Sequence, residues 1–125
     1  MIMNLILYVR DQGLSRDFYA AALGLAPRLD VPGMTEFELG PGCVLGLMPE
    51  KGIMRLLPEL PDPAGARGVP RAEVYLTVPD PAACHASALA AGARELSPLA
   101  ARDWGHEAAY SLDRDGHVLA FARPL

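Results

Sequence analysis

A repeat organises this chain of 125 residues. The segments 9–11 (VRD) and 78–80 (VPD) lie 69 residues apart, and each closes an apolar run and precedes a helix-like segment that stops at glycine. Further along, the segment 39–47 aligns with 112–121 after one inserted residue. A chain built from two similar halves is restricted to folds in which each half forms the same small unit.

Each half has the pattern of a strand, a helix and three further strands. The expected elements of the first half are a strand at 4–11, a helix at 14–23 and strands at 27–30, 35–39 and 43–48. Those of the second half are a strand at 73–80, a helix at 81–91 and strands at 94–96, 107–112 and 118–122. We therefore predict an α+β fold in which the two sheets curl around a shared interior.

The segments differ in their expected surroundings. The run 4–11 is almost continuously apolar, which is typical of a strand buried on both faces. The Pro- and Gly-rich segment 50–71 has no sustained period and is expected to be an irregular connector. We thus expect one domain made of module one (1–49), the connector (50–71) and module two (72–125).

The charge of the chain excludes some partners. Its formal net charge is −4, its pI is about 5.2 and it has no run of Lys or Arg, so nucleic acid and anionic membranes are not expected as partners. No apolar run reaches the length of a membrane span, and the first residues read as a strand rather than a leader peptide. Cys43 and Cys84 are isolated and are expected to be buried, reduced thiols. These features predict a cytoplasmic protein.

Three motifs, in order along the two halves, carry a resemblance to a known family. They are V-x-D-x(3)-S-x-x-F-Y at 9–19, the Leu-Gly pair at 23–24 and W-G-x(4)-Y-x-x-D-x-D-G at 104–116. The chain resembles the glyoxalase, bleomycin-resistance and extradiol-dioxygenase superfamily, also called vicinal oxygen chelate proteins. The resemblance covers essentially the whole chain, least well the connector. It implies two repeated βαβββ modules that form an incomplete barrel, assembled as a homodimer.

Metal-dependent members of that family are understood to hold a divalent cation at inward positions of the first and last strand of each module. The corresponding residues here are Asn4, Gly46, Glu73 and Ala120. A catalytic divalent ion needs about three protein ligands, and these positions supply one carboxylate, Glu73, and one neutral amide. A metal cofactor is therefore possible but not expected. Glu73 could instead be a pocket base, an anchor for a cationic ligand, or a strand-end carboxylate that faces water or pairs with an arginine.

Other side chains could line a cavity. His106 lies in a loop where it could act as an acid or base, and Trp104 either covers the core or stacks on a ligand. Tyr8, Tyr75 and Tyr110 fall in strands and could offer hydroxyl groups. The other two histidines have structural interpretations: His85 as a partly exposed helix residue and His117 as part of the last turn.

Three functions follow as hypotheses. The first is a metal-free protein that binds a small organic molecule, through Asn4, Tyr8, Gly46, Tyr75, Trp104, Tyr110 and Ala120, by sequestration. The second is an enzyme, either a metal-dependent lyase or dioxygenase, or an isomerase that uses Glu73 and His106 for proton transfer. The third is a domain that acts by protein contact through the apolar residues of the connector.

Overall fold

The computed structural model describes residues 1–66 and 70–125; residues 67–69 of the expected connector lie outside the described residues. The chain divides into two compact units. Unit 1 comprises Met1–Ala20 and Leu25–Gly68, and unit 2 comprises Ala21–Gly24 and Val69–Leu125. Among the described helices, none combines the length and the apolar character that a membrane span requires.

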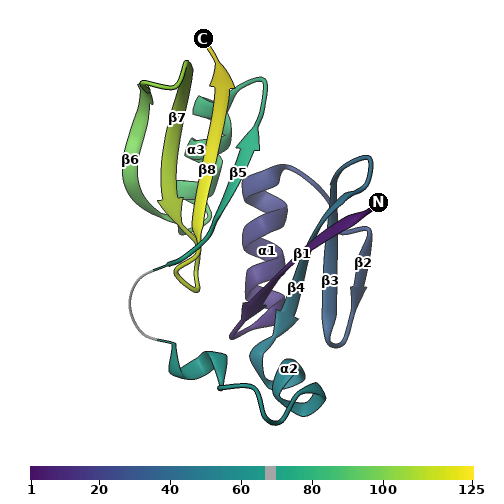
Figure 1. Cartoon of the computed structure of the whole chain (residues 1–125). Helices are drawn as coiled ribbons and strands as arrows, with labels where there is room; N and C mark the ends of the chain where they lie inside the picture. The colour runs from purple at the N-terminus through teal and green to yellow at the C-terminus, as the bar shows by residue number, and fades with distance from the viewer. Residues whose placement is uncertain (67–69) are drawn as a thin grey trace. The chain divides into compact units, whose positions relative to one another are not determined.

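Unit 1 contains a four-stranded sheet with the strand order β1-β4-β3-β2 (Figure 1). Its elements are β1 (Met3–Val9), α1 (Gln12–Leu23, whose last residues belong to unit 2), β2 (Leu29–Val31), β3 (Met34–Gly40), β4 (Cys43–Pro49), α2 (Glu50–Leu56) and a short 3₁₀ turn (Pro63–Gly65). Strand β1 lies at one edge and pairs in parallel with β4, whereas the other pairs are antiparallel.

Unit 2 contains a second four-stranded sheet, with the strand order β5-β8-β7-β6 (Figure 1). Its elements are β5 (Glu73–Thr77), α3 (Pro81–Ala90), β6 (Arg94–Ala101), β7 (His106–Leu112) and β8 (Val118–Pro124). Helix α3 packs against β6, β7 and β8. The Asp80 carboxylate caps α3 by accepting the backbone N–H of Ala83 at 3.0 Å.

The register of the strands confirms the repeat of two βαβββ modules. In unit 1, Asn4 pairs with Val44 and Ile6 pairs with Gly46. In unit 2, the residues 69 positions after Asn4 and Ile6 form the same two pairs, Glu73 with Val118 and Tyr75 with Ala120. The edge strand, the parallel pair and the strand order are therefore the same in both sheets. The incomplete barrel that the resemblance implies stays a prediction.

The burial of β1 differs from the expectation. Residues 3–6 of the strand are exposed, with Met3 58% exposed, and only Leu7 and Val9 are buried. The prediction of a strand buried on both faces was wrong for its first half, because an apolar run does not reveal whether a strand lies at the centre or at the edge of its sheet. An exposed apolar edge is a surface on which another chain can dock.

The connector contains a helix that the sequence pattern did not predict. Residues 50–56 form α2, whose backbone packs next to β4 and β1 and whose Ile53 is buried. At seven residues, α2 is too short to show a helical period by itself. The neighbouring Leu56 and Leu57 are exposed.

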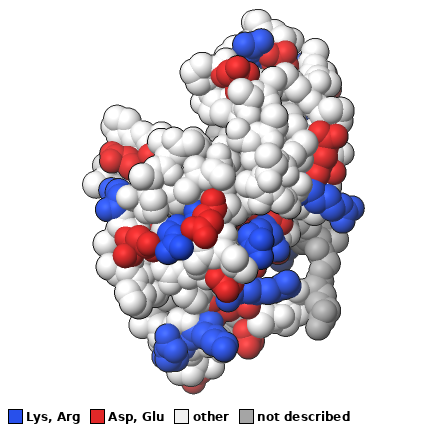
Figure 2. All heavy atoms as spheres, turned by 180° about the vertical axis from the view of Figure 1, so that it is seen from behind, with Lys and Arg blue, Asp and Glu red and all other residues white. Residues whose placement is uncertain are grey.

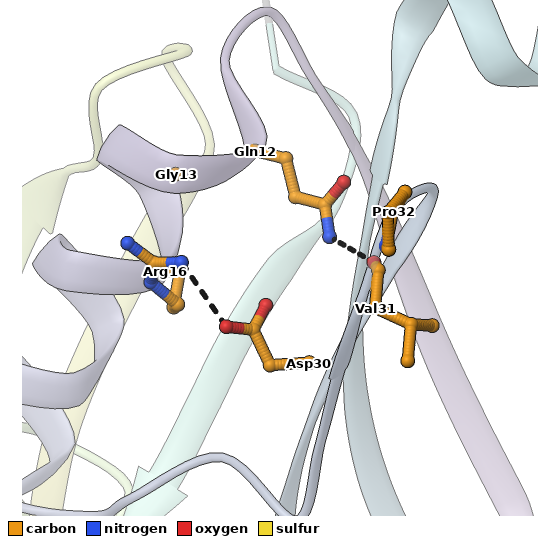
Figure 3. Close-up of a pocket in the computed structure, with 6 residues that line it drawn as sticks. All are labelled: Gln12, Gly13, Arg16, Asp30, Val31 and Pro32. Carbon is orange, nitrogen blue, oxygen red and sulfur yellow. Dashed lines mark hydrogen bonds and ion pairs between the residues drawn. The ribbon is translucent and has the colours of Figure 1, made fainter.

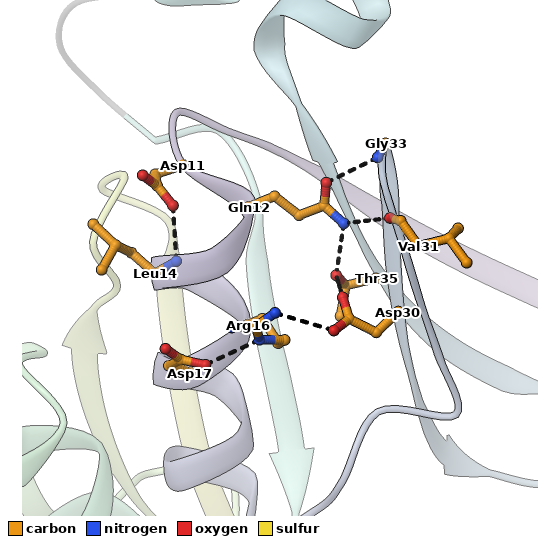
Figure 4. A network of polar contacts seen from close by, with 9 residues as sticks. All are labelled: Asp11, Gln12, Leu14, Arg16, Asp17, Asp30, Val31, Gly33 and Thr35. Atoms are coloured by element: carbon orange, nitrogen blue, oxygen red, sulfur yellow. Dashed lines mark hydrogen bonds and ion pairs between the residues drawn. The ribbon is translucent and has the colours of Figure 1, made fainter.

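A polar network ties the first turn of α1 to the β2–β3 hairpin of unit 1 (Figure 4). The Gln12 amide nitrogen donates to the Val31 carbonyl at 2.8 Å and to the Thr35 hydroxyl at 2.9 Å, and its oxygen accepts the Gly33 backbone N–H at 2.9 Å. Arg16 adds an ion pair to Asp30 at 3.0 Å. Thr35 is fully buried, so these bonds satisfy a hydroxyl group that would otherwise be costly to bury.

Candidate functional site

The sheet of unit 2 carries aromatic residues on one face. Tyr75 of β5 and Tyr110 of β7 are both in register with Ala120 of β8, so the three side chains project from the same face. Ala120 is buried and small, which leaves the two tyrosines on either side of it. The opposite face contacts α3, since Glu95 of β6 is hydrogen-bonded to His85 of that helix.

A chain of hydrogen bonds joins three of the residues that the sequence indicated. The Trp104 indole N–H donates to the Tyr75 hydroxyl oxygen at 3.2 Å. That hydroxyl group also lies 2.8 Å from Nδ1 of His106. If the Tyr75 hydroxyl donates its proton to Nδ1, the neutral imidazole carries its own proton on Nε2. Trp104 is 53% exposed, and its hydrogen bond to Tyr75 holds the ring at the surface.

Arg102, which the sequence analysis did not single out, organises the neighbouring strands. Its guanidinium group donates to the Ala108 carbonyl (2.7 Å from Nη2), the Ser97 hydroxyl (2.8 Å) and the Pro98 carbonyl (3.1 Å). Its Cζ also lies 5.3 Å from the centre of the Tyr110 ring, a cation–π contact. No motif marks such an arginine, because its partners are mostly backbone oxygens.

Tyr110 is a neutral hydrogen-bonding group at neutral pH. Burial raises the pKa of its phenol, and the nearby Glu73 and Tyr75 raise it further, while Arg102 lowers it. A phenol with a raised pKa keeps its proton and can donate it to a ligand. Tyr75, His106 and Tyr110 share one face of the sheet, and Trp104 is hydrogen-bonded to Tyr75. We call these four residues the aromatic face.

Glu73 lies on the same side of the sheet but apart from His106. It is aligned with Val118, which pairs with Leu112, six residues before His106 in reverse order along β7. At about 3.4 Å per residue this corresponds to roughly 20 Å along the strand. Glu73 is exposed and, within the described residues, has no ion pair with an arginine or any other cation. This offset concerns the backbone, since the side chain of Tyr75, two residues after Glu73, reaches His106.

The equivalent face of the unit 1 sheet carries different side chains. Gly46 occupies the position of Ala120, and a Cβ atom there would lie 3.1 Å from Cγ1 of Ile6 and 3.3 Å from Sδ of Met34. The space above Gly46 is thus filled by two apolar side chains. Asn4 is exposed near the start of β1, and Tyr8 is half-buried further along it. The structure does not bring Asn4 and Tyr8 into any hydrogen-bonded cluster within the described residues.

The four positions that hold a cation in metal-dependent relatives do not fit a divalent ion here. Gly46 and Ala120 have no donor atom, and Asn4 and Glu73 supply one amide oxygen and one carboxylate. A Cβ atom at position 46 would also require small shifts of the Ile6 and Met34 side chains. Two oxygen donors do not make the set of about three ligands that a catalytic ion needs. We therefore derive no step that involves a metal.

One other cluster of possible ligands lies in the described part of the chain, in the β7–β8 turn. One ligand atom each from Asp113, Asp115 and His117 lies within 4.8 Å of the others. The Asp113 Oδ1 atom accepts the backbone N–H groups of Asp115 (2.9 Å) and His117 (2.8 Å), and its Oδ2 lies 2.9 Å from the His117 ring. The cluster closes the hairpin, as the interpretation of His117 expected.

His85 and the two cysteines are not part of the hydrogen-bonded chain of Tyr75, Trp104 and His106. His85 is only 6% exposed, so the expectation of a partly exposed residue was wrong; the ring packs under β6, where Nε2 lies 2.9 Å from Glu95. Cys43 and Cys84 are free thiols but only half-buried, so the expectation that both are buried was wrong. Burial, followed by the charge of Asp80, raises the pKa of the Cys84 thiol, which makes it a poor nucleophile.

A cavity of about 320 Å³ lies beside the network of Gln12 in unit 1 (Figure 3). Its polar groups already have partners, because Gln12 is bonded to the β2–β3 hairpin and Arg16 to Asp17 and Asp30. These hydrogen bonds, first the one to Asp17, raise the pKa of Arg16 and keep it charged. A ligand in this cavity would have to compete with these contacts for the polar groups of Gln12 and Arg16.

Comparison with known proteins identifies the class to which this structure belongs. The family model of the Glyoxalase/Bleomycin resistance protein/Dioxygenase superfamily matches residues 2–121, and the chain belongs to this superfamily. No curated protein is similar enough in sequence to count as a match.

Solved structures share the fold. A glyoxalase/bleomycin resistance protein/dioxygenase from Nocardioides is 25% identical, with a TM-score of 0.77 over 100% of this chain and 83% of that one. A family enzyme from Burkholderia phytofirmans PsJN has a TM-score of 0.83 at 15% identity, over 98% of this chain and 97% of that one. A glyoxalase-related enzyme from Fulvimarina pelagi has a TM-score of 0.79 at 22% identity, over 98% and 87%. The last two likenesses concern the fold alone.

Proposed function

We propose that the chain binds a small planar organic molecule on the aromatic face of unit 2, without a metal ion, and acts by sequestration. The observation that carries this proposal is the exposed Trp104 ring, fixed by its hydrogen bond to Tyr75. An aromatic ring held at the surface can stack on a planar ligand at little cost in side-chain entropy. The neutral phenol of Tyr110 and Nε2 of His106 add hydrogen-bonding groups beside it.

The charge of the ligand follows from Glu73. This carboxylate is exposed on the same side of the sheet as Tyr75 and has no ion pair within the described residues. It is available to a cationic group, and the net charge of −4 favours cations over anions at longer range. The proposed ligand is therefore planar and neutral to cationic.

The test compares two probes of the same shape and opposite charge, 1-methylquinolinium and 2-naphthoate. The cation is expected to quench the fluorescence of Trp104, the only tryptophan of the chain, and to bind more tightly than the anion. Glu73→Gln should weaken binding of the cation about five- to tenfold and leave the anion unchanged, because only the charge is removed. Calorimetry with Trp104→Ala should show weaker binding of both probes.

The matched control is Glu59→Gln, which removes one exposed carboxylate of unit 1. It should leave the affinity for 1-methylquinolinium unchanged. Equal binding of the two probes, or an equal loss in both Gln variants, would show that Glu73 does not anchor a ligand.

The enzyme alternative has weaker support. Proton transfer by Glu73 and His106 on one small substrate needs the two groups close together, and no hydrogen bond joins them within the described residues, where their backbone positions are six residues out of register. The protein-contact alternative has Leu56 and Leu57, both exposed on the connector. Two side chains give less area than a specific protein interface needs. We also propose a cytoplasmic location, which is supported by the two free cysteines.

We further propose that the chain forms a homodimer through the edge strand β1. The exposed apolar residues of β1 are Met3, Leu5 and Ile6, and Met1 and Ile2 just before the strand are exposed as well. An apolar edge strand of this kind is normally covered, because it would otherwise pair with other chains. A second copy of the same strand is the simplest partner, since a twofold axis brings identical surfaces together.

Met3→Lys is expected to convert the dimer to a monomer, because a charged side chain on an edge strand blocks its pairing with another chain. Sedimentation velocity at micromolar concentration measures the change. Val31→Lys, on the exposed edge strand β2 of the same sheet, is the matched control and should remain dimeric. A dimer that survives Met3→Lys and dissociates with Val31→Lys would move the interface to the other edge.

A further inference from the structure

A second cavity lies wholly within unit 1. It has a volume of about 420 Å³ and lies between the end of β1, the helix α2 and the 3₁₀ turn. Three cationic side chains line it: Arg10, Lys51 and Arg55. On the face drawn in Figure 2, Lys and Arg side chains gather at the end that carries α2. A concentration of cations is unexpected in a chain with a net charge of −4.

Two of these cations are held close together by the helix. Lys51 and Arg55 are four residues apart in α2, so their side chains lie on the same face, and like charges at this spacing repel each other. Neither has a hydrogen bond or an ion pair with any described residue. Arg10 reaches the same cavity from the junction between β1 and α1. An anion in the cavity would relieve the repulsion.

The carboxylates around the cavity do not neutralise it. Glu50 and Asp62 also line it, which leaves an excess of one positive charge among the five charged residues. The Asp62 Oδ1 atom accepts the backbone N–H of Ala64 at 2.9 Å and caps the 3₁₀ turn. Asp62 is therefore partly engaged in holding its own segment.

We propose that this cavity binds the phosphate group of a small phosphorylated organic molecule. A phosphate monoester carries close to two negative charges at neutral pH, and its oxygens match the donors of the arginine and lysine side chains. The volume is large enough for a ligand of more than one chemical group. Met54 also lines the cavity, three residues after Lys51, and provides an apolar contact for the organic part.

The test uses phenyl phosphate, inorganic phosphate and phenol as probes, with amide shifts and calorimetry as readouts. Phenyl phosphate should bind most tightly, inorganic phosphate more weakly and phenol not measurably, and the shifts should fall on residues 50–56 of α2. Raising the salt concentration should weaken the binding of both phosphates, since charge attraction dominates it. Shifts that fall only on unit 2, or equal binding of phenol and phenyl phosphate, would overturn the proposal.

Two variants locate the site. Lys51→Gln and Arg55→Gln should each weaken the binding of phenyl phosphate about tenfold, because each removes a charged hydrogen-bond donor. Arg114→Gln removes the same charge from an exposed position in the β7–β8 turn and should leave the affinity unchanged. An equal loss in all three variants would indicate attraction by overall charge and contradict the site. Binding of 1-methylquinolinium should be the same in all three variants, which separates this result from the function proposed for the aromatic face.

Discussion

Replacing Asp113 by alanine is expected to destabilise the protein by about 2–4 kcal/mol, the largest effect on folding that we predict. The Asp113 carboxylate is buried and accepts the backbone N–H groups of Asp115 and His117, and its second oxygen contacts the His117 ring. Alanine removes every one of these acceptors at once. The turn that joins β7 to β8 also needs Gly116, whose φ of 89° favours glycine.

Urea denaturation at pH 7 followed by circular dichroism measures this loss of stability. Asp113→Asn keeps one carbonyl oxygen and is expected to lose about half as much as Asp113→Ala. Arg114→Ala is the control, since Arg114 is exposed in the same turn and has no hydrogen bond or ion pair with any described residue. A loss below 1 kcal/mol for Asp113→Ala would mean that water replaces the carboxylate and that the turn does not depend on it.

The second large effect is expected for Arg102→Ala, which should weaken both the β6–β7 hairpin and the aromatic face. The guanidinium group joins Ser97 and Pro98 to Ala108, and it lies over the Tyr110 ring. We expect a loss of about 2 kcal/mol in stability, because the carbonyls lose a charged donor. Because Tyr110 packs under this group, binding of 1-methylquinolinium should weaken as well.

The ionisation of Tyr110 gives a direct readout of this change. Arg102 lowers the pKa of the Tyr110 phenol, against burial and the charge of Glu73, so its removal should raise that pKa further. Ultraviolet difference titration above pH 9, with Tyr110→Phe to identify the signal, measures the shift. Arg102→Lys keeps the positive charge but loses the planar guanidinium group. The pKa of Tyr110 should therefore stay close to that of the wild type, whereas part of the stability is lost. An unchanged pKa in Arg102→Ala would contradict the contact.

The fold was predictable because the repeat is carried by local signals. Alternating apolar runs and turn glycines define the strands, and the offset of 69 residues correctly paired Asn4 with Glu73 as equivalent positions. The prediction that Tyr75 and Tyr110 fall in strands holds, and their common face follows from the register with Ala120.

Other features depend on contacts that no local pattern encodes. Arg102 donates to backbone carbonyls of two strands. Every residue has a carbonyl group, so the sequence does not indicate which of them an arginine will contact. His85 is buried because Glu95 meets it from a neighbouring strand, which the composition of the helix alone does not reveal. The exposure of Met3 depends on the position of β1 at the sheet edge. Partners distant along the chain decide each of these cases.

The shared register of the two sheets makes each half a structural template for the other. Ile6 and Tyr75 occupy the same place in their sheets, as do Gly46 and Ala120, yet one half is filled with aliphatic side chains and the other displays rings and hydroxyl groups. In a duplicated fold, one module can thus keep apolar packing at these positions while the other carries polar and aromatic side chains. The side chains of the aromatic face could therefore be introduced by substitution at the equivalent positions of unit 1, one strand at a time.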